Sequence, residues 1–421
     1  MLSRSLEKSV WAFLAVILCG PGHAADGLDI ATAESIALER DAGLQAFEAR
    51  SKGLREDAVA DGALPDPEIM LGAEGIPVDA PGSSDMMTMY KLGVRQRIPA
   101  GQSRRYRAEK SGFMAEAEEL GQAARKRTVL REVRAAWLDW AIADRELEVA
   151  RAAERTFAEL VETTEFRYRA GRGRQMDINQ ARLERARLQQ RILTRESDVD
   201  RARAELARWL GNALGPSAHP SDLPEWPEPD DHSDLLEQLP AHPVIQAEER
   251  RARAGEAETR LARQAYRPEW MVEAGYAHQR GNDPMDGGRM SDRVFGMVSF
   301  SLPLFTANRQ DRRLAAARKR LDGLERDREE RIQEYEARLD RALTEWKRYG
   351  EILQLQDATL VPEAERAEVA ARSAYKADQA SFDELVRARI ERLDQDLERL
   401  ETHRTVLLAR TELLYLAGDD Q

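Results

Sequence analysis

Few residues in this chain combine the types and spacing that catalysis or metal binding requires. Its histidines show no ligand spacing: His219, His232, His242, His278 and His403. The sequence has no glycine-rich phosphate loop, and its single cysteine, Cys19, lies near the N-terminus. A histidine or acid on a polar helix is far more often solvated than catalytic. We therefore expect no enzyme activity, no cofactor and no resident metal.

Methionine thioethers are the remaining candidates for metal chemistry. Met86, Met87 and Met89 lie together, and Met285 and Met290 share a second short segment. Thioether sulfur prefers soft ions such as Cu(I) or Ag(I). Methionine more often fills packing gaps or faces lipid. Met86, Met87 and Met89 are therefore only weak candidate ligands.

Two acidic residues each follow a repeated tyrosine motif. Tyr168-Arg169-Ala170-Gly171 precedes Asp177, and Tyr375-Lys376-Ala377 precedes Glu384. Acids are favoured in the first turn of a helix because they complement the positive end of its dipole. This interpretation explains both acids without any further function.

The tyrosine motif belongs to an internal repeat that covers most of the chain. Leu44-Gln45-Ala46 recurs as Ile245-Gln246-Ala247, and Val94 with Ile98-Pro99 recurs as Val298 with Leu302-Pro303. The spacing between the copies is nearly constant, which indicates a duplicated architecture. We predict one repeat over 25–214, a proline-rich linker over 215–232 and a second repeat over 233–418.

Hydrophobic periodicity predicts the same order of elements in each repeat. Alternation of apolar and polar residues predicts strands, and the 3.6-residue period predicts helices. The expected helices are 30–63, 103–168, 174–210, 234–266, 306–374 and 381–416. The expected strands are 68–76, 88–98, 269–279 and 293–302, and turns are expected near 169–176 and 375–382.

The strands have one apolar and one polar face. Trp270, Val272 and Tyr276 alternate with Met271 and Glu273. This pattern suits a barrel wall between lipid and water, although an amphipathic hairpin on a soluble core would show it as well. The helix of about 66 residues favours the first interpretation, because the two shorter helices of its repeat match its length when laid end to end.

Two of the helices carry heptad patterns. The last helix has an apolar residue at every seventh position: Val386, Leu393, Leu400, Leu407 and Leu414. Apolar residues at this spacing predict coiled-coil packing between neighbouring helices.

The N-terminus predicts export. Arg4 and Lys8 precede an apolar run over 10–18, and small residues lead to an expected cleavage after Ala24. Removing 1–24 takes away two positive charges and one negative charge, so the net charge of -12 becomes more negative. An acidic chain is not expected to bind nucleic acid. A run of this length is too short to span a membrane.

The repeated motifs resemble the TolC-like outer-membrane efflux factors, over essentially the whole mature chain. A closer likeness to the heavy-metal branch, the CzcC/CusC-type partners of RND pumps, rests on short segments before and within the strands. These are Leu64-Pro65-Asp66-Pro67-Glu68, Met86-Met87-Thr88-Met89, Tyr266-Arg267-Pro268-Glu269-Trp270 and Asn308-Arg309-Gln310-Asp311.

The resemblance implies a fold that is mainly α with a small membrane β-barrel. Three subunits would share a 12-stranded barrel in the outer membrane and continue it as a periplasmic helical tunnel. The expected partners are a periplasmic adaptor, or membrane fusion protein, and an inner-membrane RND pump, and the expected cargo is heavy-metal cations.

The resemblance also implies a constriction at the periplasmic tips. It places Asp177 and Tyr375 there, with an acidic ring at Glu384, and carboxylates around a narrow pore concentrate cations. The chain departs from the family pattern in having Ala380 in place of an arginine and Arg387 in place of an acid. The alternative functions are a drug or type I secretion conduit and, in another class, a periplasmic coiled-coil adaptor or structural protein.

Overall fold

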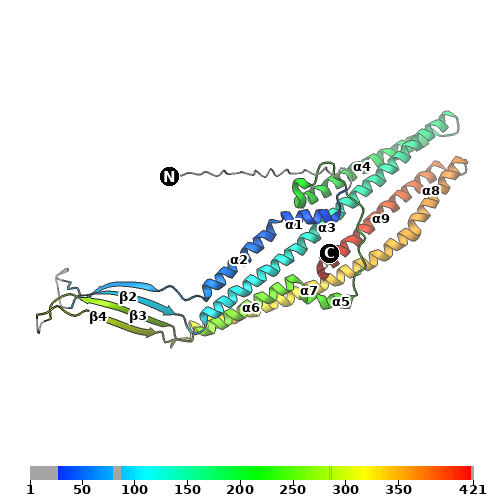
Figure 1. Ribbon diagram of the computed structural model, residues 1–421. Helices are drawn as coiled ribbons and strands as arrows, with labels where there is room; N and C mark the ends of the chain where they lie inside the picture. Colours follow the sequence, from blue (N-terminus) through cyan, green and yellow to red (C-terminus); the bar gives the residue numbers. More distant parts are fainter. Residues whose placement is uncertain (1–26, 79–86, 284, 286, 419–421) are drawn as a thin grey trace, which may run out of the picture.

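The molecule is elongated, with a sheet at one end and long helices that run away from it (Figure 1). The computed structural model describes residues 27–78, 87–283, 285 and 287–418. The expected fold class, mainly α with a small strand region and a duplicated plan, is confirmed. The predicted signal peptide, Cys19 and Met86 lie outside the described residues.

One long helix organises the first half of the chain. Helix α3 (Ser103–Arg169) has 67 residues, which at about 1.5 Å per residue extend roughly 100 Å. Helices α2 (Ala42–Gly62) and α4 (Gln175–Leu210) pack along different parts of it. The short α1 (Ile30–Arg40) contacts α3 and α4 near the middle. The shorter helices therefore lie along the long one as their lengths predict.

The second half repeats this arrangement with more interruptions. Its helices are α5 (His232–Gln238), α6 (Pro243–Gln264), α7 (Gln310–Leu355), α8 (Val361–Lys376) and α9 (Phe382–Ala417). Helices α6 and α9 pack on α7, and both also contact α3, which joins the halves. Within the described residues, no helix is long and apolar enough to cross a membrane.

Two predicted helices are divided. The single helix predicted over 30–63 is wrong, because Asp41 ends α1 and its Oδ1 accepts the Leu44 N–H at 2.9 Å to begin α2. The single helix predicted over 234–266 is also wrong. Pro240 and Pro243 lack a backbone N–H and so cannot lie in a helix interior, and the 3-10 turn η2 (Leu239–Ala241) separates α5 from α6.

The helix predicted over 306–374 is shorter at its start and is interrupted in its last third. It begins at Gln310, after a turn over 306–309. The π-helical segment η3 (Gln356–Leu360) then separates α7 from α8. Such segments add a residue to one turn and shift the faces that follow. The helix leaves the 3.6-residue period at this point, but the sequence pattern does not indicate the change.

The heptad residues form the predicted helical seam. All five ladder residues of α9, from Val386 to Leu414, are buried. The second heptad pattern lies on α4, where four of its residues are buried and three are half-buried. The buried ones are Ile178, Ala181, Leu188 and Leu206, and the half-buried ones are Ile192, Val199 and Ala202. These residues belong to separate apolar clusters along the molecule, so the core is a long seam and not a single globular centre.

A buried aromatic cluster joins α6, α7 and α9. The His242 ring centre lies 4.8 Å from that of Tyr335 and 5.0 Å from that of Tyr415, and the two tyrosine hydroxyls lie 2.7 Å apart. Burial, aided by the Arg127 charge, lowers the pKa of His242 to about 4. The imidazole is therefore neutral near pH 7, so that it packs between the two rings without a buried charge.

The four strands form one antiparallel sheet in chain order. They are β1 (Glu68–Glu74), β2 (Met89–Ile98), β3 (Trp270–Gln279) and β4 (Arg293–Phe300). The pairing of β2 with β3 joins the two halves of the chain into one sheet. Strands β1 and β4 are its two edges.

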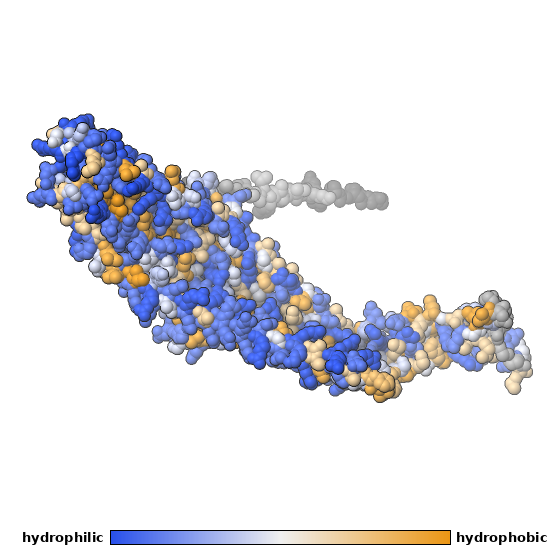
Figure 2. Space-filling view, turned by 180° about the vertical axis from the view of Figure 1, so that it is seen from behind, coloured by the Kyte–Doolittle hydropathy of each residue, from blue (hydrophilic) through white to orange (hydrophobic). Residues whose placement is uncertain are grey.

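The register gives the sheet one apolar face and one polar face. Leu71, Leu92 and Tyr276 are aligned across three strands on the apolar face, and all three are exposed. Figure 2 shows apolar patches at this end of the molecule, whereas the helical body is mainly hydrophilic. The polar face carries Glu68, Arg95 and Glu273 in one row.

Two glycines on the polar face allow a matched test of the sheet. A Cβ at Gly275 would lie 2.5 Å from the Leu92 carbonyl oxygen and 2.6 Å from Phe295 Cζ, whereas a Cβ at Gly72 would meet nothing within 4 Å. We expect Gly275→Val to destabilise the sheet by about 1–3 kcal/mol, as overpacking does, and to lower the thermal midpoint in detergent measured by circular dichroism. Gly72→Val is the control, and equal midpoints for the two variants would contradict this packing.

Candidate functional site

The predicted constriction residues lie at the end of the molecule far from the sheet. Helix α3 turns into α4 over 170–174, and α8 turns into α9 over 377–381. The two turns lie side by side, where Gln180 on α4 donates a hydrogen bond to Asp383 on α9 at 3.1 Å (Figure 1). This end of the molecule is called the tip below.

Asp177 begins α4 at the tip. It is buried, with 7% of the residue exposed. Its Oδ2 accepts the Arg174 backbone N–H at 3.3 Å, and its Oδ1 lies 3.5 Å from the Arg174 guanidinium. The carboxylate therefore satisfies a backbone N–H that has no partner within the helix.

Glu384 has the equivalent position at the start of α9. Its Oε2 accepts the Ser381 backbone N–H at 2.7 Å, and Ser381 Oγ accepts the Glu384 N–H at 3.2 Å, which is a capping box. These hydrogen bonds from Ser381 hold the pKa of Glu384 below its usual value. The residue is exposed, so an ionised carboxylate faces away from the core of the subunit.

Tyr375 is packed inside the tip. It is 7% exposed, and its ring lies edge-on to that of Phe382 at 5.9 Å. Burial raises the pKa of Tyr375, the nearby Arg167 charge opposes the rise, and the Asp177 carboxylate adds to it. The structure thus brings Tyr375 close to the charges of Asp177 and Arg167, whereas Glu384 lies exposed beside Ser381.

Arg167 connects the two turns and was missed in the sequence. Its Nη1 donates to the Tyr375 carbonyl oxygen at 3.4 Å, its guanidinium lies 4.6 Å from the Tyr375 ring centre, and it forms an ion pair with Asp378. Asp378 has a left-handed backbone with φ of 58°. One signal in the sequence was available: Arg167 precedes Tyr168 in the first repeat, whereas Ala374 precedes the equivalent Tyr375 in the second.

Arg387 and Ala380, the two departures from the family pattern, make few contacts with other elements of the tip. Arg387 pairs with Asp383 of its own helix at 2.5 Å, and both side chains are exposed. Ala380 lies in the turn just before Ser381 and is partly buried. Arg167 therefore supplies a guanidinium at the tip, although it comes from the other hairpin than the one that carries Ala380.

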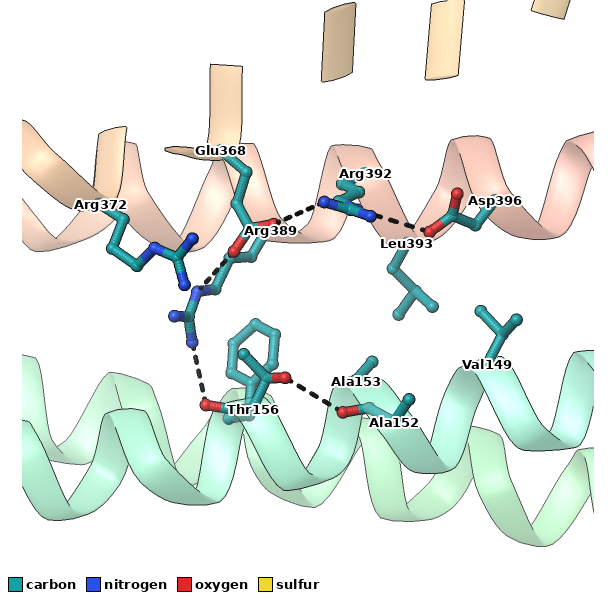
Figure 3. Close-up of a pocket in the computed structure, with 11 residues that line it drawn as sticks. Val149, Ala152, Ala153, Thr156, Glu368, Arg372, Arg389, Arg392, Leu393 and Asp396 are labelled. Carbon is teal, nitrogen blue, oxygen red and sulfur yellow. Dashed lines mark hydrogen bonds and ion pairs between the residues drawn. The ribbon is translucent and has the colours of Figure 1, made fainter. Parts of the chain in front are cut away.

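A cleft of about 340 Å³ lies between α3, α8 and α9 next to the tip (Figure 3). A chain of ion pairs crosses it: Arg389 to Glu368 at 3.4 Å, Glu368 to Arg392 at 3.5 Å and Arg392 to Asp396 at 3.7 Å. Arg389 also donates to the Thr156 carbonyl oxygen at 2.9 Å. Burial lowers the pKa of Arg389 from its usual value. The network ties α9 to both α8 and α3.

The polar face of the sheet forms a second hollow, of about 840 Å³. Arg95 Nε lies 2.5 Å from Glu273 Oε1, and Arg95 Nη1 lies 3.5 Å from Glu68 Oε2. The described residues include no group of three or more histidine, cysteine or acidic residues that could hold a metal ion. Of the methionines singled out in the sequence, Met87 and Met285 are exposed near the hairpin ends and Met89 is half-buried.

Comparisons with known proteins agree with this architecture. The family model described as "Outer membrane efflux protein" matches residues 34–212 and 236–419. The fold is similar to the outer membrane protein VceC of Vibrio cholerae, with a TM-score of 0.78, 18% identity, and coverage of 92% of this chain and 96% of that one.

Two further solved structures have the same fold. The channel OprN matches with a TM-score of 0.78 and 19% identity over 92% of this chain and 89% of its own. CusC matches with a TM-score of 0.77 and 16% identity over 96% of this chain and 95% of its own. A search of curated protein sequences finds no significant match.

The contacts of Arg167 predict a measurable coupling between the two turns. We expect Arg167→Met to accelerate amide hydrogen exchange over 375–381 about fivefold, because losing a partly exposed ion pair costs about 1 kcal/mol. Arg169→Met is the matched control, since Arg169 Nε donates to Glu165 of its own helix at 3.4 Å. Equal exchange rates in the two variants would show that Arg167 does not hold the turns together.

Proposed function

The chain belongs to the outer membrane efflux protein family, and on this premise we propose that it exports heavy-metal cations as the outer-membrane channel of a tripartite RND system. Family members are channels and not enzymes, which agrees with the absence of catalytic spacing in the sequence. The observation that carries the channel part of this proposal is the four-stranded amphipathic sheet at the end of duplicated helical hairpins.

The two open edges of the sheet favour a barrel that several copies share, and membership of the family implies that the copies are three. In hydrocarbon, the unpaired N–H and C=O groups of β1 and β4 would each cost several kcal/mol. About eight strands are needed before a barrel interior can hold even packed side chains. Three copies of the sheet would give twelve strands, pair every edge and direct the exposed apolar face, including Leu71 and Val294, towards lipid. The helices would then continue the barrel into the periplasm.

The constriction is proposed at the tip. Asp177 and Tyr375 are held by contacts within the subunit, and the exposed Glu384 is available to face the three-fold axis. The capping hydrogen bonds of both acids are compatible with this role, because each carboxylate has further oxygen lone pairs. Three Glu384 carboxylates around a narrow pore would favour cations over anions.

The proposed partners are a periplasmic adaptor and an inner-membrane RND pump. The tip is the end farthest from the sheet, so it is the end that would face the inner membrane. Arg372, Arg389 and Glu368 line the cleft beside the tip, together with apolar side chains such as Phe157 and Leu393. Such a mixture of charge and apolar surface suits contact with the helical hairpin of another protein.

The cargo is inferred from the likeness to the heavy-metal branch in the segments that flank the strands. The ordinary alternative is a drug or type I secretion conduit, which would share the same fold. An isolated adaptor or structural coiled coil would not need a four-stranded sheet with an exposed apolar face.

The proposed constriction predicts an effect on conductance. We expect Asp177→Ala combined with Tyr375→Phe to raise single-channel conductance in a planar bilayer, because the cap at the start of α4 and the hydrogen bond of the Tyr375 hydroxyl are both lost. Glu384→Gln should instead lower the preference for cations over anions. Unchanged conductance in the double variant would contradict the assignment of Asp177 and Tyr375 to the constriction. If Glu384→Gln still altered the ion preference, only the acidic ring at Glu384 would be supported.

The proposed cargo predicts a metal phenotype. We expect a deletion strain to lose tolerance to at least one of copper, silver, zinc, cobalt or cadmium, and plasmid-borne protein to restore it. Growth at graded metal concentrations measures the effect. Unchanged metal tolerance together with new sensitivity to dyes and antibiotics would favour the drug conduit.

A further inference from the structure

The methionines of the sheet all lie on one face. The strands contain Met70, Met89, Met271 and Met297, one on each strand. The register places each of them with the charged residues: Met297 is opposite Glu273, and Met271 is opposite Ser299 and next to Arg97. None of these four methionines shares the apolar face with Leu71, Leu92 and Tyr276.

Met70 packs over Gly93, whereas Met297 is neither buried nor on the apolar face. A residue that faces lipid would lie on the apolar face, and a residue that fills a packing gap would be buried. Met297 is 52% exposed in the subunit, and it lies on the face that would line the water-filled interior of the proposed barrel. In the subunit its thioether is accessible from that side, which is the property that a ligand for a soft ion requires.

Two of these methionines are neighbours across one strand pair. Met271 pairs with Ser299, and Met297 pairs with Glu273, so the two methionines are diagonal neighbours on β3 and β4. Diagonal neighbours on one face of an antiparallel pair are about 7–8 Å apart at the backbone, within reach of long side chains. Both side chains are accessible, Met271 partly and Met297 by half.

A carboxylate completes this group of residues. The side chain of Glu273 is 6% exposed and is fixed by Arg95 Nε at 2.5 Å. Arg95 balances its charge, so the group as a whole does not attract hard cations strongly. Neutral thioethers bind soft monovalent ions and need no deprotonation to do so. Such a site would select soft metal ions over hard ones because of its sulfur ligands, and not because of its net charge.

We propose that Met271 and Met297, with Glu273 beside them, form a binding site for a soft monovalent cation, Cu(I) or Ag(I), on the inner face of the barrel. The site rests on the proposed function, because it needs the polar face of the sheet to line the conduit. It narrows the proposed heavy-metal cargo to soft ions. Three copies would encircle the barrel interior of the trimer.

Silver titration of the full-length protein in detergent tests the site. The probe is Ag⁺ as its nitrate in chloride-free buffer, followed by calorimetry. We expect the combined Met271→Leu and Met297→Leu variant to bind one Ag⁺ fewer per subunit than the parent protein. Met176→Leu is the matched control, because Met176 is 62% exposed on α4 at the tip, and it should bind as the parent does. Leucine preserves volume, and equal thermal midpoints confirm that the sheet is intact.

The outcomes separate this site from the channel function. Equal Ag⁺ stoichiometry in the double variant and the parent overturns the site, even if the deletion strain loses metal tolerance. A loss of one Ag⁺ per subunit supports the site, even if deletion leaves metal tolerance unchanged and so refutes the cargo. An equal loss in Met176→Leu would show unspecific thioether binding and would also overturn the site.

Discussion

Backbone hydrogen bonding in the sheet is the constraint on which the rest of this architecture depends. Strands β2 and β3 are paired on both sides, whereas β1 and β4 each have one open edge. The exposed apolar face, with Ile69 and Val294 among its residues, suits lipid, where an open edge has no water to bond. A subunit with this sheet is therefore incomplete alone, and closure by other copies sets the symmetry of the helices as well.

The helices carry that symmetry to the other end of the molecule. Helix α3 runs from the sheet to the tip without a break, and the buried leucine ladder of α9 packs beside it. The Arg389 network and Arg167 then fix the second hairpin to the first.

Sequence patterns predicted the parts of this fold that repeat. Alternation identified both faces of β3, and the heptads identified the buried residues of α9. The break at Asp41 was missed because an aspartate is also tolerated within helices, whereas Pro240 and Pro243 were a signal that the helix predicted over 234–266 did not take into account. The Arg167 contacts were missed for a different reason: Asp378 reaches Arg167 only through the turn after α8, and residues far apart in sequence leave no periodic signal. Asp177 and Glu384 were located by the repeat, but only the structure shows their capping bonds.

The central claim is that three copies of this chain close one barrel, and the mass of the purified assembly tests it most directly. Protein extracted from outer membranes in mild detergent should give, by native mass spectrometry, a complex of three mature chains that separates into single chains only on heating. A folded single chain recovered from the soluble fraction, with the sheet intact by circular dichroism, would contradict the account.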